Sequence, residues 1–384
     1  MRGRRLLLAG VLVAFLLTGC WNRREIETLG FAFLIGIDYA PDEQLYDLSV
    51  QIGKTAAFAK EAPGGAGMTA KPFHVWSARG RTVFDAMRHI TRESNRKIWL
   101  GHNLIVVIGE EAARQGVQPI LDMYSRDGEY RRPIWVVVTP GKARDVVTAE
   151  VKAVKVPAMA LNDTIKLHGA TSTAQATRLH DFLRMAAAPM AATVGKVIVV
   201  QRTMGPEFHY EGSAVFRGDK LAGYLNGEET RGLLWVTHKV KSGILVVACP
   251  RNAGNAGLEI IHAKGSVTPV FHPLPTMAVK IRVESNIGDD ACADLRYTTE
   301  DWRLLERAAE QVIREEVGAA LRRARELKAD MFGFGLRIYQ ENPVYWKRVE
   351  TAWAERYFQD VPVAIKAEVR IRRPGLVTRR TGSK

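Results

Sequence analysis

The first 20 residues constrain this chain most, because they set the compartment in which the rest must fold. They read MRGRRLLLAGVLVAFLLTGC, with arginines at positions 2, 4 and 5 followed by an apolar run over residues 6–17. A helix needs about 20 apolar residues to cross a hydrocarbon core of about 30 Å, and this run is shorter. A basic tip followed by a short apolar run is typical of a secretory signal. The sequence therefore predicts a signal peptide over residues 1–19 and an exported globular body.

The residues that end this segment, Leu17-Thr18-Gly19-Cys20, resemble the bacterial lipoprotein box. In that class the cysteine thiol carries a diacylglyceryl group and becomes the mature N-terminus, so Cys20 is the predicted lipidation site. Two acyl chains hold a protein stably on a membrane, whereas one holds it only marginally. The alternatives are an ordinary cleaved signal and an uncleaved anchor in which Cys20 stands by chance.

The remainder of the chain has the composition of a globular protein that rests on a membrane without crossing it. Residues 101–109 and 133–140 are apolar, but they are short and bounded by turn formers, as buried strands are. With 384 residues, 47% of them hydrophobic, the chain is long enough for at least two domains. The formal net charge is +14 for the whole chain, or 14 − 3 = +11 without the arginines at positions 2, 4 and 5, and this excess favours anionic lipid headgroups or cell-surface polymers as counter-charges. No RNA-binding or zinc-finger pattern occurs, so no nucleic-acid partner is expected.

The first half alternates strands with helices, which predicts an α/β domain with partly parallel strand pairing. Predicted strands cover residues 29–39, 45–52, 104–108, 134–139 and 194–201, and predicted helices cover 79–92, 110–115 and 119–126. The stretch 153–189 consists mostly of small residues and is helical in character. We assign residues 20–203 to this N-terminal α/β domain, with a division into two subdomains left open.

A change to β-rich sequence follows Thr203-Met204-Gly205-Pro206. Predicted strands cover 208–216, 220–225, 233–238, 243–249, 258–262, 276–285 and 361–371, and Gly218-Asp219 forms a two-residue hairpin turn. This indicates a C-terminal α+β domain over residues 204–373 and a basic, disordered tail over 374–384. The predicted fold class is a multi-domain, mixed α/β protein whose antiparallel-rich C-terminal sheet is packed by long helices.

One long helix is predicted within this second domain, capped by Thr299 and carrying Glu300 and Asp301 in its first turn. Its apolar stripe runs from Trp302 to Met331 with a period of 3.6 residues. A coiled coil is the alternative, but the period and the small residues in the stripe favour packing on a sheet. A second helix is predicted over residues 343–358, after a break at residues 332–335.

Two cysteines remain besides Cys20. Cys249 and Cys292 each lie next to strand-like sequence. An exported protein could join them in a disulfide. Because they have no characteristic spacing, separate buried thiols are the favoured interpretation.

The sequence contains no pattern that predicts catalysis, a cofactor or a metal site. No HExxH motif occurs, the serines lack a GxSxG elbow, and glycines 64, 65 and 67 have no following Lys-Ser/Thr. Asp289, Asp290 and Asp294 lack the alternation of an EF-hand and are interpreted as a solvated turn. His102 is expected at the end of a strand, and His262 and His272 at the flanks of a hairpin.

Several short motifs, taken in order, resemble the Ger(x)C family of spore germination lipoproteins. Cys20-Trp21-Asn22-Arg23-Arg24-Glu25-Ile26 is similar to the CWDxREI start of that family, with Asn22 in place of the usual Asp. Glu229-Thr230-Arg231-Gly232 before Trp235, and Asp330-Met331-Phe332-Gly333-Phe334-Gly335 before Pro343, are similar to its C-terminal motifs.

The resemblance implies a non-enzymatic C subunit of a nutrient germinant receptor. Such a subunit lies on the outer face of the spore inner membrane beside two integral-membrane partners, A and B. The nutrient, and whether this subunit contacts it, stay open. The alternative is a solute-binding lipoprotein of a transporter, which requires two α/β lobes around a cleft and fits the β-rich block 208–285 poorly. An exported enzyme of unrecognised type is a third hypothesis.

Overall fold

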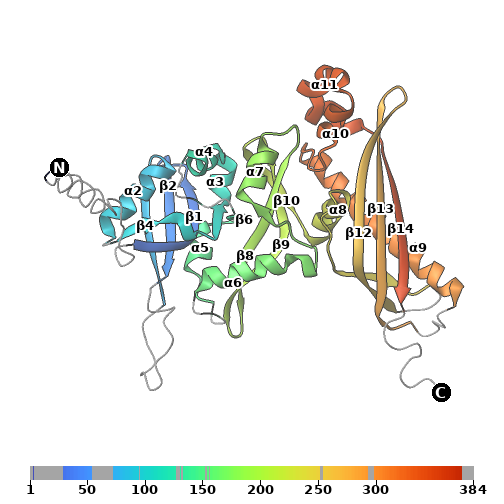
Figure 1. Cartoon of the computed structure of the whole chain (residues 1–384), viewed down its shortest axis with the longest axis horizontal. Coiled ribbons are helices and arrows are strands. Elements are labelled where there is room, and N and C mark those ends of the chain that lie inside the picture. The colour runs from blue at the N-terminus through green and yellow to red at the C-terminus, as the bar shows by residue number, and fades with distance from the viewer. Residues whose placement is uncertain are drawn as a thin grey trace.

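The computed structural model describes residues 29–53, 72–94, 96–126, 130, 133–151, 154, 156–250, 254–292 and 298–373, together with Gly3. Two sheets lie one after the other along the long axis of the molecule (Figure 1). The predicted lipidation site and the predicted tail 374–384 lie outside the described residues.

The first sheet has ten strands in the order β10-β9-β8-β6-β5-β1-β2-β3, with β4 beside β1 and β7 beside β6. The strands are β1 (Leu29–Ala40), β2 (Leu45–Gly53), β3 (Phe73–Gly80), β4 (Lys97–Trp99), β5 (Ile105–Gly109), β6 (Trp135–Thr139), β7 (Thr177–Arg178), β8 (Ala192–Arg202), β9 (Gly205–Arg217) and β10 (Lys220–Leu225). The central strands β1, β5, β6 and β8 are parallel, and the outer strands pair antiparallel. Every residue of β5 and β6 is buried, as the apolar runs predict.

Helices cover both faces of this sheet. On one face lie α2 (Val83–Glu93), α3 (Glu110–Gln115), α4 (Gln118–Arg126) and α7 (Leu179–Ala186), and on the other lie α5 (Ala143–Thr148) and α6 (Pro157–Lys166). The predicted helix 79–92 begins later, at Val83, because the chain continues as β3 through Gly80. Thr82 provides the cap, since its side chain accepts a hydrogen bond from the Asp85 amide.

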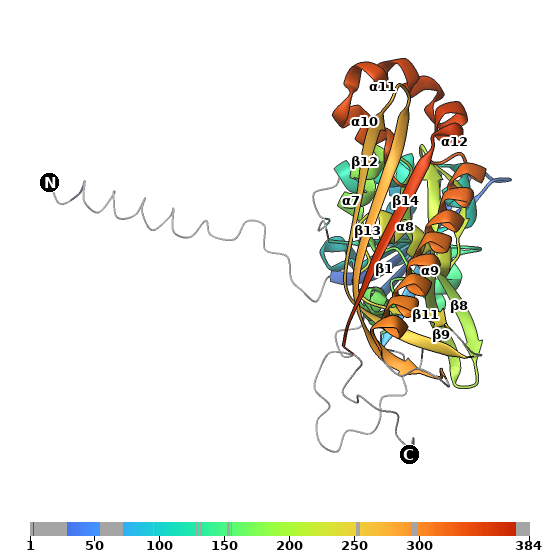
Figure 2. The same ribbon diagram turned by 90° about the vertical axis from the view of Figure 1, so that its right-hand side faces the viewer.

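The second sheet has the order β11-β12-β13-β14. It consists of β11 (Ile244–Ala248), β12 (Asn255–Phe271), β13 (Pro275–Asp290) and β14 (Val363–Arg373), with β14 parallel to β13 and the other pairs antiparallel. The long helix α9 (Thr299–Glu326) runs along this sheet (Figure 2) and buries Leu305, Ile313 and Val317 in the same core as Val279 and Ile281. Intramolecular packing of the long helix, and the predicted mixed α/β fold class, are therefore confirmed.

Several predictions of element type or extent are wrong in this part of the chain. The strand predicted over 258–262 is the 17-residue β12, so His262 lies inside a strand, opposite Glu284, and not at the flank of a hairpin. Residues 233–238 do not form a strand, because α8 (Gly227–Val236) begins at a capping box between Asn226 and Glu229. The cap of α9 is Thr298, whose side chain accepts from the Asp301 amide, and the helix ends at Glu326. The single helix predicted over 343–358 is a succession of short turns: α11 (Pro343–Val349), η5 (Glu350–Ala352), η6 (Trp353–Tyr357) and α12 (Phe358–Asp360).

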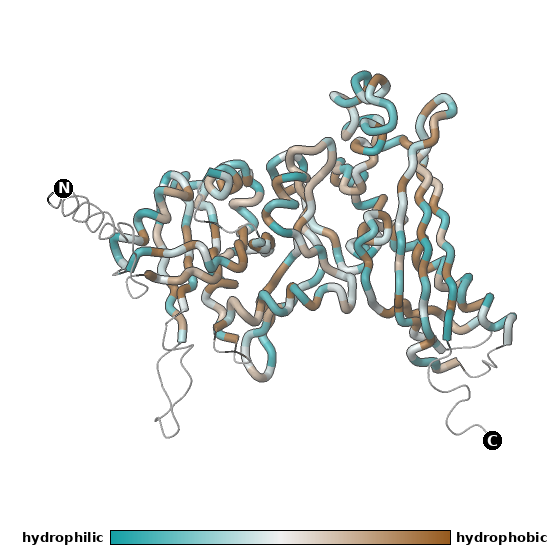
Figure 3. Tube along the Cα trace, in the orientation of Figure 1, coloured by the Kyte–Doolittle hydropathy of each residue, from teal (hydrophilic) through white to brown (hydrophobic). Residues whose placement is uncertain are grey.

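The predicted break after the long helix is present. Gly333 adopts a φ of +72°, a conformation that favours glycine, and α10 (Phe334–Glu341) begins at the next residue. The tube in Figure 3 marks apolar stretches of both sheets in brown, whereas hydrophilic residues in teal are prominent on the outer helices.

Cys249 and Cys292 form a disulfide, with Cα atoms 5.5 Å apart, so the favoured interpretation of separate thiols is wrong. Ala248 pairs with Asn255 at the end of β11, and the Ala291 amide donates to the Asn255 carbonyl. This register brings the two cysteines to the same end of the sheet, although 43 residues separate them in sequence.

The strands β9 and β10, which follow the predicted boundary after residue 203, extend the first sheet by pairing with β8 and with each other. Val215 and Leu225 also contribute to the core of the second sheet. The domain limits 20–203 and 204–373 stay predictions.

Candidate functional site

A groove opens between helices α2 and α4, with a cavity volume of about 670 Å³. This size lies within the range of about 300–1,000 Å³ typical of ligand sites. Apolar side chains from both helices and from β4 and η3 (Leu100–His102) line it: Val83, Phe84, Met87, Ile98, Leu100, Pro119 and Met123.

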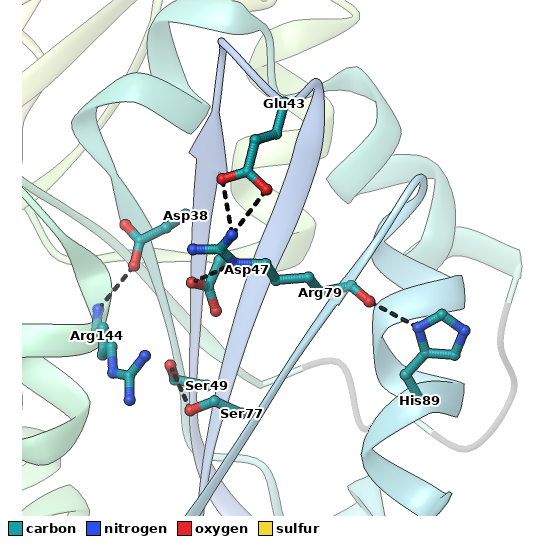
Figure 4. A network of polar contacts seen from close by, with 8 residues as sticks. All are labelled: Asp38, Glu43, Asp47, Ser49, Ser77, Arg79, His89 and Arg144. Carbon is teal, nitrogen blue, oxygen red and sulfur yellow. Dashed lines mark hydrogen bonds and ion pairs between the residues drawn. The ribbon is translucent and has the colours of Figure 1, made fainter.

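The α2 wall is fixed to the neighbouring strands by polar contacts (Figure 4). The Arg79 guanidinium donates to both carboxylate oxygens of Glu43, at 2.7 and 2.8 Å, and its Nε lies 3.5 Å from Asp47. The carbonyl of Arg79 lies 2.7 Å from Nδ1 of His89 on α2. These contacts connect the β1–β2 turn, β3 and α2, so this wall has a defined position.

The α4 wall is fixed from below by Tyr124, whose hydroxyl accepts a hydrogen bond from Asn103 Nδ2 at 3.3 Å. Asn103 in turn accepts from the Ile105 amide at the start of β5. Burial raises the pKa of Tyr124 well above its usual value, so its hydroxyl stays neutral. The ring of Tyr130, which also lines the groove, lies 4.2 Å from the Tyr124 ring.

The groove leaves a large aromatic side chain in contact with solvent. Phe84 is 45% exposed, and the guanidinium of Arg88 lies 4.8 Å above its ring. Lys97 and Arg126 also line the groove, and Arg126 pairs with Asp122 at 2.8 Å. The described lining therefore combines an apolar floor with a mainly basic rim.

The groove could not be predicted from the sequence. Within the predicted helix 79–92, Val83, Met87 and Ile90 are spaced to share one apolar face, and all three are buried. Phe84 follows Val83 in sequence and lies off that apolar face. A large aromatic residue at this position was the available signal for an exposed apolar surface. The groove also needs α4, whose position beside α2 follows from the sheet order.

The remaining candidates from the sequence do not converge on a site. Within the described ranges, no three His, Cys, Asp or Glu side chains come together as metal ligands would. Asp289 and Asp290 end β13, and Asp294 lies outside the described residues. His102 makes an edge-to-face contact with Phe31 at 4.9 Å.

The predicted lipidation site, Cys20, lies outside the described residues, nine positions before Leu29. Leu29 begins β1 and pairs with Lys97 of β4, so the chain enters the fold next to the floor of the groove. None of the helices in the described ranges has the length and apolar composition to cross a bilayer.

The motif around Arg231 joins α8 to α9. Arg231 Nε donates to both carboxylate oxygens of Glu316, at 3.1 and 3.0 Å, and Trp235 Nε1 donates to the same carboxylate at 2.7 Å. At Gly232 a Cβ would collide with the Glu316 carbonyl oxygen, so the close approach of the two helices requires glycine.

The motif that begins at Asp330 organises the short helices at the end of the chain. Its buried carboxylate accepts hydrogen bonds from the amides of Phe334 and Gly335, at 3.0 and 2.7 Å, and from Trp353 Nε1 at 2.9 Å. Burial raises the pKa of Asp330, and these hydrogen bonds oppose that shift. The Asp330 carboxylate therefore holds the start of α10 and Trp353 together in the fold.

Comparison with known proteins identifies the class. Residues 22–199 match the family described as "Spore germination protein N-terminal domain", and residues 211–375 match "Spore germination B3/ GerAC like, C-terminal". The chain belongs to the GerAC/GerKC family of spore germination C-subunit proteins, as the resemblance in its motifs implies.

Full-length relatives come from Bacillus subtilis (strain 168). Spore germination protein KC is 27% identical, with 97% of each chain covered, and spore germination protein B3 is 24% identical, with 88% of this chain and 90% of the relative covered. The crystal structure of the GerBC protein superimposes with a TM-score of 0.58 at 20% identity, over 90% of this chain and 99% of that chain. This structural likeness shows the shared fold.

Proposed function

We propose that this protein is the lipid-anchored C subunit of a nutrient germinant receptor. It acts by contact with two integral-membrane subunits, A and B, on the outer face of the spore inner membrane. The observation that carries the proposal is the match of two family models over residues 22–199 and 211–375. The lipoprotein-box sequence before Cys20 supports the anchor.

Three carboxylates at packing positions support a non-enzymatic role, because their oxygens accept hydrogen bonds from groups within the fold. Glu316 and Asp330 hold helices together, as described above. Asp38 at the end of β1 accepts from the amides of Ala143 and Arg144, at 2.7 and 2.9 Å, and so caps α5 (Figure 4). Burial raises the pKa of Asp38, and the two amide hydrogen bonds oppose that shift.

The partnership is tested by purification of the full-length tagged protein from spore membranes in mild detergent. We expect both integral-membrane subunits to co-purify with it in comparable amounts. Recovery of the protein alone after gentle extraction would contradict the proposal, because a receptor subunit acts through its partners.

The anchor is tested by Cys20→Ala in the full-length protein. Since the acyl chains require the Cys20 thiol, we expect the variant to leave the membrane fraction and spores to germinate more slowly. Thr18→Ala is the matched control, because it changes the same segment but keeps the thiol. Unchanged retention of Cys20→Ala in the membrane fraction would refute lipid anchoring.

A further inference from the structure

We propose that the groove between α2 and α4 binds an amphipathic helix with an acidic flank, contributed by an integral-membrane subunit. The inference rests on the proposed function, because it assigns a surface to that partnership.

The shape and lining of the groove match a helix. Its walls are two helices, α2 of 11 residues and α4 of 9, and its floor is formed by Ile98 and Leu100. A helix of 9–11 residues is about 14–16 Å long, so the trough accommodates about two to three turns of a bound helix. Apolar side chains at i, i+3 and i+4 of such a helix would cover Phe84 and Met87.

Charges on the rim define the polar side of the partner. Arg88 lies on α2, Arg126 on α4, and Lys97 on the floor strand, so basic groups flank the apolar floor from both walls. Among the lining side chains that the structure describes, Asp122 is the acidic one, and it is paired with Arg126. Acidic side chains on the bound helix complement this rim, whereas a basic helix would be repelled.

The position of the groove relative to the predicted anchor brings it near the membrane. The floor strand β4 pairs with the first three residues of β1, at Leu29↔Lys97, Gly30↔Ile98 and Phe31↔Trp99. Leu29 lies nine positions after Cys20, which is at most about 30 Å of extended chain. A protein tethered at Cys20 therefore holds this groove within reach of segments that emerge from the bilayer.

The first experiment places the photoreactive residue p-benzoylphenylalanine at Phe84 of the full-length protein in sporulating cells. Leu274 is the matched control, since it is 65% exposed and lies in the turn between β12 and β13 of the second sheet. We expect the probe at Phe84, and not at Leu274, to crosslink to a helical segment of an integral-membrane subunit that carries Asp or Glu. Adducts with lipid alone, or no adduct at Phe84, would overturn the proposal.

The second experiment compares co-purification of the membrane subunits with wild type, Phe84→Glu, Arg126→Glu and Leu274→Glu. We expect at least a tenfold loss for Phe84→Glu, a partial loss for Arg126→Glu and no change for Leu274→Glu. Equal thermal unfolding midpoints show that the exposed substitutions leave the fold intact. If wild type retains the subunits and Phe84→Glu does so equally, only the groove assignment fails. If wild type itself lacks them, the proposed function fails and this inference fails with it.

Discussion

The buried charged residues of this protein connect elements that are distant in sequence. Arg231 and Glu316 are 85 positions apart, yet their side chains are 14% and 7% exposed and lie against each other between α8 and α9. A buried ion pair loses hydration, and its attraction compensates for that loss only while both partners are present. The Arg231 motif, which carries part of the family resemblance, thus packs α8 against α9.

Glu316→Ala is expected to lower the free energy of unfolding by about 3–5 kcal/mol, because the Arg231 guanidinium stays buried without its carboxylate. Urea denaturation at neutral pH measures the loss. The control is the double variant Arg231→Met/Glu316→Leu, which should lose less, since neither buried charge remains. A single variant within about 1 kcal/mol of wild type would show that the pair contributes little to the fold.

At the scale of elements, local sequence signals predict the secondary structure well where those signals are unambiguous. The helix α3 begins at Glu110 and ends at Gln115 as predicted, because Gly116 with a φ of +133° stops it. The apolar stripe of α9 was likewise predicted, since its period of 3.6 residues distinguishes a helix from a strand.

The segment α8 was predicted as a strand because Leu233–Val236 is a continuous apolar run. Such a run fits a strand and a fully buried helix equally well. All four residues are buried in the core of the second sheet, so packing on every side removes the periodic pattern. The capping box at Asn226 and Glu229 was the local signal that could have decided between the two.

Two glycines on this pair of helices should respond to alanine in opposite directions. Gly232→Ala on α8 is expected to destabilise the protein by about 1–3 kcal/mol, because the new methyl group collides with the Glu316 carbonyl. Gly318→Ala on α9 meets only the tip of Arg322, at 3.4 Å, and should stabilise the protein by about 0.5–1 kcal/mol through helix propensity. Thermal unfolding of the two variants measures both changes. Equal changes in unfolding free energy for the two variants would contradict the close packing at Gly232.

At the scale of the whole molecule, the order of strands and the surfaces between elements could not be predicted. The four parallel strands β1, β5, β6 and β8 are joined by crossovers, and β1 pairs with β2, β4 and β5. These pairings depend on contacts between distant segments, which periodicity does not encode. The groove between α2 and α4 is a result of that order, and so is the meeting of Cys249 with Cys292.

The disulfide should stabilise the C-terminal sheet, because it connects cysteines beyond the ends of β11 and β13 across a separation of 43 residues. A crosslink over such a loop restricts the unfolded chain, so reduction should cost about 2–4 kcal/mol of unfolding free energy. Urea denaturation with and without a reducing agent measures the cost in wild type, and the double variant Cys249→Ala/Cys292→Ala should show no response to the agent. Such bonds persist in oxidising compartments, which agrees with the proposed export of this subunit. Equal midpoints for oxidised and reduced wild type would mean that the packing of α9 on the sheet, and not the crosslink, determines the stability of this half of the protein.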